Sequence, residues 1–148
     1  MQKFVIHTDG GARGNPGPAG AGAVITDAAG TEIKKVHKEL GVLTNNEAEY
    51  QAVILGLDTL KRMKGSGALK SAAVEVRLDS ELVARQLSGK YQIKEPTLQP
   101  LFMKILNKRV AHFPQLEFVY VPREENREAD RLANRAMDQQ TISAAPLF

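Results

Sequence analysis

The segment TDGGARGNPGP, residues 8–18, lies where an apolar stretch of the chain gives way to glycine and proline. The β-branched and aromatic residues before it predict a strand from Lys3 to Asp9. The glycines and prolines that follow predict a loop from Gly10 to Gly20. An acid at this junction can project from the end of a sheet, while adjacent glycines let a second backbone come close. An aspartate that merely begins a turn is the alternative interpretation.

Outward from this segment, hydrophobic periodicity and turn residues predict the remaining elements. The predicted strands are 3–9, 21–26, 31–40, 71–78 and 116–121. The predicted helices are 44–64, 80–87, 97–111 and 124–139. Three strands in sequence, then strands alternating with helices, predict an α/β fold with a five-stranded mixed sheet, antiparallel then parallel, and flanking helices.

Length and composition narrow the class of protein. The 148 residues suit one domain, which we place at 1–140, with the aperiodic residues 141–148 as a carboxyl-terminal tail. The absence of cysteine excludes disulfides and thiolate metal sites, and it fits a reducing compartment. The first residues do not form a secretory signal, and no apolar run approaches a membrane span. We therefore expect a cytoplasmic protein with no membrane contact.

The net charge of +3 is modest, but its distribution can matter more. If four acids gather in a metal site, 13 of the 17 acids remain against 20 bases, an excess of 7. The rest of the surface would then be basic enough to meet nucleic acid. An ordinary basic protein is the alternative interpretation.

Two glutamates near the start of the helix at 44–64 differ in their surroundings. Thr44-Asn45-Asn46-Glu47 has the form of a capping box, so Glu47 is expected to cap the helix. Glu49 shares its helix face with Val53 and Leu57, which is apolar and packs on the sheet. A buried acid there needs a partner or a metal ion.

Asp79 and Asp130 both have ordinary interpretations when taken alone. Asp79 follows a predicted strand and precedes Ser80, a pair that commonly caps the next helix. Asp130 follows the core-facing Ala129 and can form a surface ion pair with Arg127. Neither acid alone indicates a function.

Taken in order, however, four local sequences resemble the signatures of type 1 ribonucleases H. Segment 8–18 resembles the first-strand signature, 44–49 the second motif, Asp79-Ser80 the third and 126–133 the fourth. The resemblance covers residues 3–137, and every metal-ligand position is kept. It implies a ribonuclease H-like fold and an endonuclease that hydrolyses the RNA strand of RNA–DNA hybrids.

The same resemblance implies the cofactor and the site. Two Mg²⁺ ions, which Mn²⁺ can replace, would be held by Asp9, Glu49, Asp79 and Asp130, with Asp9 shared between them. One ion would activate water and the other would stabilise the leaving 3′ oxygen, giving 5′-phosphate and 3′-hydroxyl ends. Substrate contacts would come from Gly10, Gly11, Ala12, Asn15, Thr44, Asn45 and Asn46. For the Thr44–Asn46 run, helix capping alone is the alternative. We expect a monomer.

Three departures place the chain with a prokaryotic subset of that family. The loop at 121–126 lacks the histidine of many bacterial members, and Glu124 and Glu125 occupy it, either assisting catalysis or capping the last helix. The region at 88–94 is too short for a basic, Trp-containing protrusion, which leaves Lys90, Tyr91 and Lys94 as hybrid contacts. We also expect no separate amino-terminal hybrid-binding domain.

The arginines of the last helix and the alternative functions stay open from sequence. Arg127, Arg131 and Arg135 recur every fourth residue, and ion pairs with Glu124 and Glu128 compete with phosphate contacts. The fold also suits nucleases that cut double-stranded RNA or DNA junctions, although the Thr44–Asn46 run argues against a junction resolvase. A non-catalytic hybrid-binding relative would be expected to have lost a metal ligand.

Overall fold

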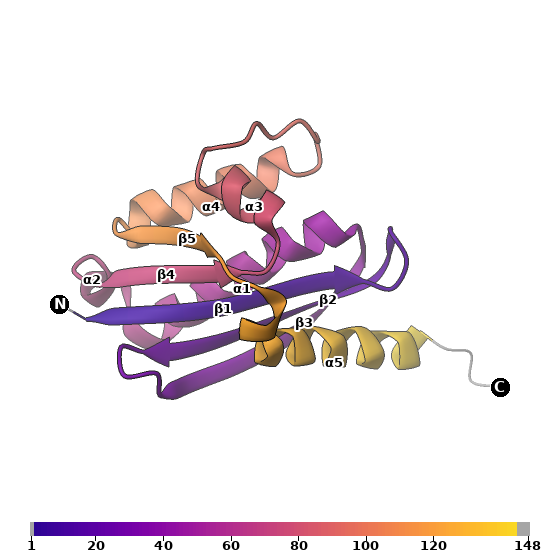
Figure 1. Ribbon diagram of the computed structural model, residues 1–148, viewed down its shortest axis with the longest axis horizontal. Helices are drawn as coiled ribbons and strands as arrows, with labels where there is room; N and C mark the ends of the chain where they lie inside the picture. The colour runs from indigo at the N-terminus through magenta and orange to yellow at the C-terminus, as the bar shows by residue number, and fades with distance from the viewer. Residues whose placement is uncertain (1, 145–148) are drawn as a thin grey trace.

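Five strands form one mixed sheet in the order β3-β2-β1-β4-β5 (Figure 1). The computed structural model describes residues 2–144. The strands are β1 Lys3–Ala12, β2 Gly17–Asp27, β3 Glu32–Leu43, β4 Ala73–Leu78 and β5 Leu116–Tyr120. Strand β2 is antiparallel to β1 and β3, whereas β4 is parallel to β1 and β5. The predicted α/β class and strand directions are confirmed.

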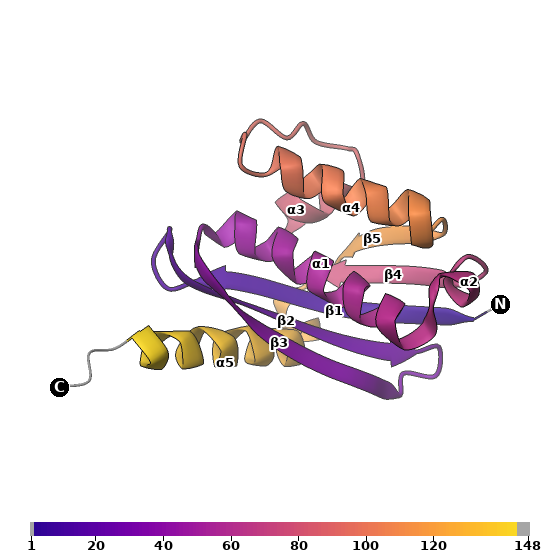
Figure 2. The ribbon, with the colours of Figure 1, turned by 180° about the vertical axis from the view of Figure 1, so that it is seen from behind.

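Helices cover both faces of this sheet. They are α1 Asn45–Lys64, α2 Ser66–Leu69, α3 Glu81–Leu87, α4 Gln99–His112 and α5 Arg127–Ala144, with a short 3₁₀ helix, η1, at Arg123–Glu125. Helix α1 crosses one face and α5 lies against the other, as the front and rear views show (Figures 1 and 2). Among the described residues, no helix combines the length and apolar character needed to cross a bilayer.

The main core lies between the sheet and α1. Alternate residues of β1 and β4, including Phe4, Ile6 and Val76, point toward this helix. Val53 and Leu57 of α1 meet them and are fully buried. The prediction that this helix face packs on the sheet is therefore confirmed, and it brings Glu49 to the sheet as well.

The glycine-rich segment is mostly strand, so the predicted loop from Gly10 to Gly20 is wrong in extent. Only residues 13–16 lie between β1 and β2. The glycines serve the packing of helices: a Cβ on Gly10 would lie 2.1 Å from the carbonyl oxygen of Ala48 in α1. A Cβ on Gly22 would lie 2.5 Å from the carbonyl oxygen of Ala129 in α5. Helix backbones thus come closer to the sheet than any side chain would permit.

The last helix is longer than predicted. Helix α5 begins at Arg127 and continues to Ala144, so residues 141–144 of the expected tail are helical, and 145–148 lie outside the described residues. The side chain of Gln140 accepts hydrogen bonds from the backbone N–H groups of Leu40 and Gly41 and donates one to the Gly41 carbonyl. These contacts with β3 extend the packing of α5 beyond its apolar period.

Candidate active site

Three carboxylates meet where β1, the start of α1 and the end of β4 come together. Asp9, Glu49 and Asp79 each offer an oxygen atom, and these atoms lie within 4.8 Å of one another. Asp9 and Glu49 are only 8% and 9% exposed, and Asp79 is half-buried. The structure therefore brings together three of the four acids predicted from sequence.

Local sequence explains how each of these acids reaches the cluster. The close approach at Gly10 sets β1 against α1 beside Asp9. A complete capping box begins α1: Thr44 Oγ1 accepts from the Glu47 N–H, and Glu47 Oε1 accepts from the Thr44 N–H. Helix α3 is capped by the hydroxyl of Ser80, which accepts from the Val83 N–H. The carboxylate of Asp79 is consequently not used as that helix cap.

Asp130 lies beside this trio on α5, in contact with Asp9. It is half-buried, and a hydrogen-bonding contact between the two carboxyl groups contributes to the raised pKa of Asp9. Within residues 2–144 Asp130 makes no ion pair, so the surface pair with Arg127 is not found. The fourth predicted acid thus borders the cluster from the other face of the sheet.

Burial and mutual repulsion disfavour ionisation of Asp9, Glu49 and Asp79 in the metal-free protein. Burial, then the charge of Asp79 and the contact with Asp130, raise the pKa of Asp9 to about 8. Burial and the charges of Asp9 and Asp79 raise the pKa of Glu49 well above its ordinary value. Burial raises the pKa of Asp79, opposed by a hydrogen bond from Asn126 and by the positive charge of Arg123.

This donor set fits a divalent cation. Oxygen Oε2 of Glu49 is buried and has no hydrogen-bond partner among the described residues. A buried carboxylate oxygen without a partner is costly unless a cation or donor meets it. Clustered carboxylate oxygens are the ligands that hard divalent ions such as Mg²⁺ prefer. The chemistry available at the site is therefore that of a divalent metal held by acids.

The predicted substrate-contact residues form a connected group beside the carboxylates. Asn45 Oδ1 accepts from the Ala12 N–H at 2.9 Å, and Asn15 Oδ1 accepts from the Asn45 N–H at 3.0 Å. Asn45 is exposed, and its Nδ2 has no hydrogen-bond partner within the described range. The Nδ2 group of Asn45 is therefore available as a donor toward a ligand, whereas the Ala12 N–H is already engaged.

The remaining residues of this group have structural partners too. Thr44 caps α1, which supports the capping interpretation for that residue. Asn46 Nδ2 donates to Glu95 in the segment before α4 at 3.4 Å. That segment also holds the exposed Lys90 and Tyr91, and the Tyr91 ring lies 5.6 Å from the Arg85 guanidinium. Asn46 thus links the start of α1 to the segment expected to contact the hybrid.

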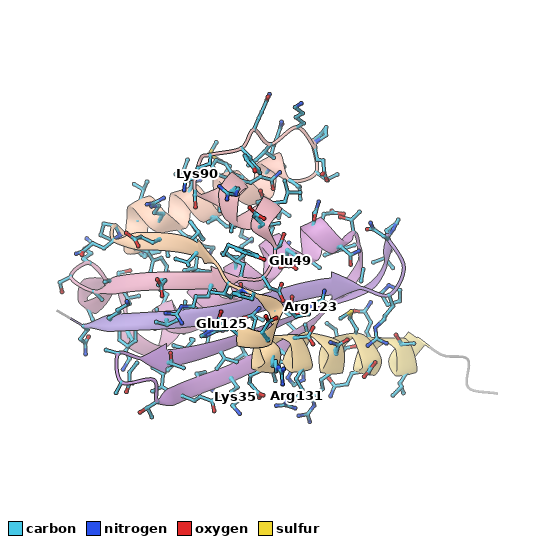
Figure 3. All side chains as sticks on the ribbon, viewed as in Figure 1. Lys35, Glu49, Lys90, Arg123, Glu125 and Arg131 are labelled. Atoms are coloured by element: carbon cyan, nitrogen blue, oxygen red, sulfur yellow. The ribbon has the colours of Figure 1, made fainter. Side chains whose placement is uncertain are left out.

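The two auxiliary glutamates are not part of the cluster in this structure. Glu124 and Glu125 lie in η1, are exposed, and make no side-chain hydrogen bond or ion pair with the described residues. Burial and the positive charge of Arg77 lower the pKa of His7, and the charge of Glu125 is a minor opposing effect. Figure 3 shows Glu125 and Arg123 on different sides of η1, with Arg123 on the side of Glu49.

Sequence reasoning missed Arg123 and Asn126. The positive charge of Arg123 acts on Asp79, and its guanidinium has no ion pair within residues 2–144. Arg123 lies in the loop where a histidine is missing, and a cation there was a signal that could have found it. Asn126 is 1% exposed and reaches both β1 and Asp79. Its burial could not be read from a motif rich in charged residues.

Of the three arginines of α5, one has a clear partner. Arg131 forms an ion pair with Glu128 at 2.6 Å, and Glu128 also pairs with Lys35 of β3 at 3.1 Å. Figure 3 shows Lys35 and Arg131 near each other at the amino-terminal end of α5. The ion-pair interpretation is therefore confirmed for Arg131, and Arg127 and Arg135 have no ion pair in the described part of the chain.

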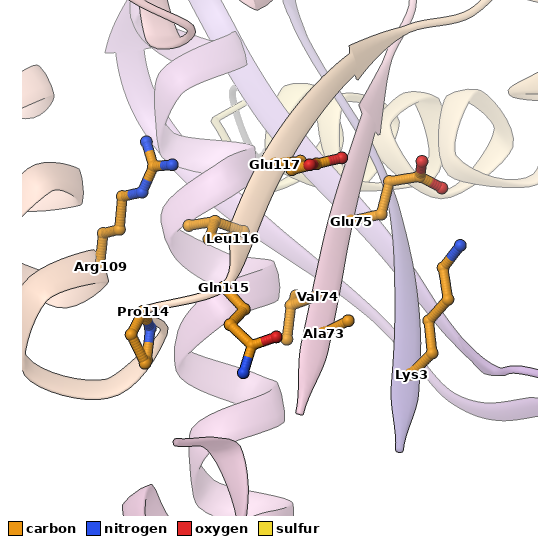
Figure 4. Close-up of a pocket in the computed structure, with 9 residues that line it drawn as sticks. All are labelled: Lys3, Ala73, Val74, Glu75, Arg109, Pro114, Gln115, Leu116 and Glu117. Atoms are coloured by element: carbon orange, nitrogen blue, oxygen red, sulfur yellow. The ribbon is translucent and has the colours of Figure 1, made fainter. Parts of the chain in front are cut away.

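A cavity of about 430 Å³ lies away from the carboxylates (Figure 4). It borders the starting ends of β1, β4 and β5, and Lys3, Glu75, Arg109 and Glu117 bring charges of both signs to it. None of the residues assigned to the site from sequence lines it. The cavity is therefore separate from the candidate active site.

Comparison with known proteins gives one consistent family. The family model described as reverse transcriptase-like matches residues 7–136. A bifunctional protein of Mycobacterium tuberculosis is 43% identical over 144 residues, which cover 97% of this chain but only 38% of that relative. A ribonuclease H of Hydrogenovibrio crunogenus is 32% identical over 154 residues, covering 95% of this chain and 99% of the relative.

Solved structures agree with these relatives. LC11-RNase H1, isolated from compost by a metagenomic approach, is 50% identical with a TM-score of 0.88, covering 94% of this chain and 98% of its own. The same enzyme in complex with an RNA/DNA hybrid is 48% identical with a TM-score of 0.88, covering 92% and 97%. RNase H1 of the archaeon Halobacterium salinarum is 33% identical with a TM-score of 0.84, covering 93% and 98%.

Proposed function

The chain belongs to the type 1 ribonuclease H family, and from that premise we propose that it is an endonuclease that hydrolyses the RNA strand of RNA–DNA hybrids. The observation that carries the proposal is the convergence of Asp9, Glu49 and Asp79 within 4.8 Å at a buried corner of the sheet. The hybrid bound to a relative of 48% identity supports the choice of substrate. Because the chain spans only 38% of the mycobacterial relatives, their full activities are not transferred to it.

The proposed cofactor is a pair of Mg²⁺ ions, for which Mn²⁺ can substitute. Asp9, Glu49, Asp79 and Asp130 would hold them, with Asp9 shared. Such ions, when bound, make water a better nucleophile and stabilise the charge of the leaving oxygen. The products would be a 5′-phosphate and a 3′-hydroxyl.

Recognition of RNA within a hybrid requires contacts with the ribose 2′-hydroxyl. The unpaired Nδ2 of Asn45 supports a donor role toward such a hydroxyl, beside the backbone of Gly10 and Gly11. The exposed Asn15 and the half-buried Thr44 and Asn46 would meet backbone phosphate nearby. These groups bind and orient the strand, and the acids next to them act on it.

We further propose that the protein works as a monomer in the cytoplasm. The cysteine-free sequence supports a reducing compartment. Residues 1–140 would form the functional domain.

Cleavage of three matched duplexes tests the proposed function. One sequence is prepared as RNA–DNA hybrid, double-stranded RNA and double-stranded DNA, and each is incubated with Mg²⁺, Mn²⁺ or a chelator. The proposal predicts cleavage of the RNA strand of the hybrid alone, with either metal and not with the chelator. Equal cleavage of double-stranded RNA would replace hybrid specificity with a broader nuclease. Tight binding of the hybrid without cleavage would indicate a non-catalytic relative.

A further inference from the structure

Asn126 is a deeply buried polar residue beside the carboxylate cluster. It lies between η1 and α5 and is 1% exposed. Its Nδ2 donates to the carbonyl oxygen of Thr8 at 2.9 Å, in a buried hydrogen bond between residues 118 positions apart. Thr8 immediately precedes Asp9, so this bond ties the start of α5 to the strand residue beside Asp9.

The same residue reaches two further acids. Its side-chain amide also faces Asp79 and, as a hydrogen-bond donor, lowers the pKa of that carboxyl against the effect of burial. Its main-chain carbonyl accepts from the N–H of Asp130 at 3.1 Å, the first turn of α5. Asn126 therefore faces Asp79 with its side chain, is hydrogen-bonded to the backbone of Thr8 next to Asp9, and is hydrogen-bonded to the backbone of Asp130.

The orientation of the amide follows from its surroundings. Thr8 O and the Asp79 carboxylate are both acceptors, so only the two N–H donors of Nδ2 can face them. The consequence is that Oδ1 is buried and has no partner within residues 2–144. A buried amide oxygen without a donor is unfavourable for stability. Asn126 Oδ1 is thus left without a hydrogen bond, while the two N–H donors of Nδ2 face Thr8 and Asp79.

We infer that Asn126 is a positioning residue that holds Asp79 against the end of β1, so that Asp79 and Asp9 lie at metal-binding distance before a metal binds. The inference rests on the proposed function, because it gives Asn126 a task in the same site. Carboxylates that repel one another move apart unless another group holds them. The Asn126 amide is already ordered in the core, so it can hold Asp79 without a further loss of side-chain entropy. Groups that orient metal ligands in this way commonly contribute tenfold or more to metal affinity.

Metal binding in the absence of substrate gives the direct test. Mn²⁺ affinity of the whole chain is measured by calorimetry, alongside kcat and KM for hybrid and a thermal melt in chelator. Asn126→Ala is expected to weaken Mn²⁺ binding at least about tenfold and to lower kcat by a similar factor, with KM for hybrid changed less than about twofold. Asn126→Ser, a milder change at a buried position, is measured in parallel and should shift Mn²⁺ affinity in the same direction.

Leu132→Ala is the matched control for lost packing on the same helix. Leu132 is 3% exposed, and its Cβ packs against Gly22 of β2. This variant should melt at a lower temperature while keeping wild-type Mn²⁺ affinity. If Asn126→Ala lowered the melting temperature as Leu132→Ala does and left Mn²⁺ affinity and kcat unchanged, Asn126 would be structural only and the inference would be overturned.

A double-mutant cycle with Asp79→Asn identifies the route of the effect. If Asn126 acts through Asp79, Asn126→Ala should change Mn²⁺ affinity little when Asp79 is already Asn. An undiminished effect in that background would contradict the inference. Because this cycle measures Mn²⁺ binding, it tests the role of Asn126 even if the wild-type protein does not cleave hybrid. Absence of cleavage would refute the proposed function and not the inference about Asn126.

Discussion

Asp9 is buried, lies beside Glu49, Asp79 and Asp130, and has a pKa raised to about 8, against an ordinary value of 3.8. A carboxyl whose pKa is higher in the folded than in the unfolded state contributes stability at low pH, and that stability is lost as pH rises toward 8. Because the ordinary pKa is 3.8 and the folded pKa is about 8, the metal-free melting temperature should fall between about pH 4 and about pH 8 through this group. Divalent metal replaces the bound protons, so stabilisation by Mg²⁺ should grow over the same range.

Thermal melts with Mg²⁺ and with chelator, at about pH 6 and about pH 9, measure this difference. The predicted result is a larger Mg²⁺-dependent rise in melting temperature at the higher pH. A rise that is larger at the lower pH would show that the acids are ionised without metal, and the electrostatic description of the cluster would be wrong.

Asn45 provides a second prediction at the scale of one residue. Its Oδ1 is engaged by Ala12, and its Nδ2 is the group free for substrate. Asn45→Ala should lower kcat/KM for hybrid by about 5-fold to 150-fold, as expected for a lost hydrogen bond of about 1–3 kcal/mol. The exposed position makes a large change in melting temperature unexpected. A sharp fall in melting temperature with unchanged kcat/KM would make Asn45 a structural residue.

Single residues also show where sequence reasoning stops. The positions of Asp9, Glu49 and Asp79 followed from motifs, and the structure brings them together. Asn126 and Arg123 did not follow, because their importance comes from contacts between η1, β1 and β4 that are distant in sequence. Contacts of that kind depend on the packing of elements, which local patterns do not encode.

Among the elements, η1 differs most from what we expected, because Arg123 and not Glu124 or Glu125 faces the carboxylate cluster. Its Arg123 acts on Asp79, whereas Glu125 acts on His7. We predict that Arg123→Ala lowers turnover of hybrid several-fold, since a cation beside the acids is lost. The double change Glu124→Gln, Glu125→Gln should leave turnover near wild type.

Steady-state kinetics of both variants, with thermal melts as control, measure this contrast. If the glutamate variant lost turnover and Arg123→Ala did not, the result would favour the catalytic role of Glu124 and Glu125 over helix capping, the two interpretations that the sequence leaves open. Equal loss in both variants, together with lower melting temperatures, would indicate that η1 matters only for stability.

Element boundaries were predictable where capping or periodicity set them. The capping box at Thr44 and the helix to Lys64 were found as predicted. The extent of β1 and β2 was not, because the glycines that mark loops in isolation here admit helix backbones at Gly10 and Gly22. The end of α5 was missed because a polar contact of Gln140 with β3 takes over where apolar periodicity ends.

At the scale of the whole molecule, we predict that electrostatic attraction drives binding of the hybrid. Four acids are gathered in or beside one site, and exposed cations such as Lys90 and Lys94 form no ion pair in the described part of the chain. Affinity for hybrid should fall at least about tenfold between about 50 and about 200 mM salt, because phosphate contacts release counterions. Binding of catalytically inactive protein to labelled hybrid across this range is the measurement. Lys90→Ala should reduce the salt dependence, and a flat response in wild type would contradict a basic binding surface.

We propose that the acids at the junction of β1, α1 and β4 form a metal-dependent centre for cutting RNA. The most direct test is single-turnover cleavage of the RNA strand of a hybrid in Mg²⁺ by wild type and Asp9→Asn, with both proteins shown to be folded. Asp9 is proposed as the ligand shared by both ions, so its replacement should reduce the rate by at least about a thousandfold. The same change removes a buried acid, so the metal-free melting temperature should not fall. Near wild-type cleavage by a folded Asp9→Asn protein would contradict the account.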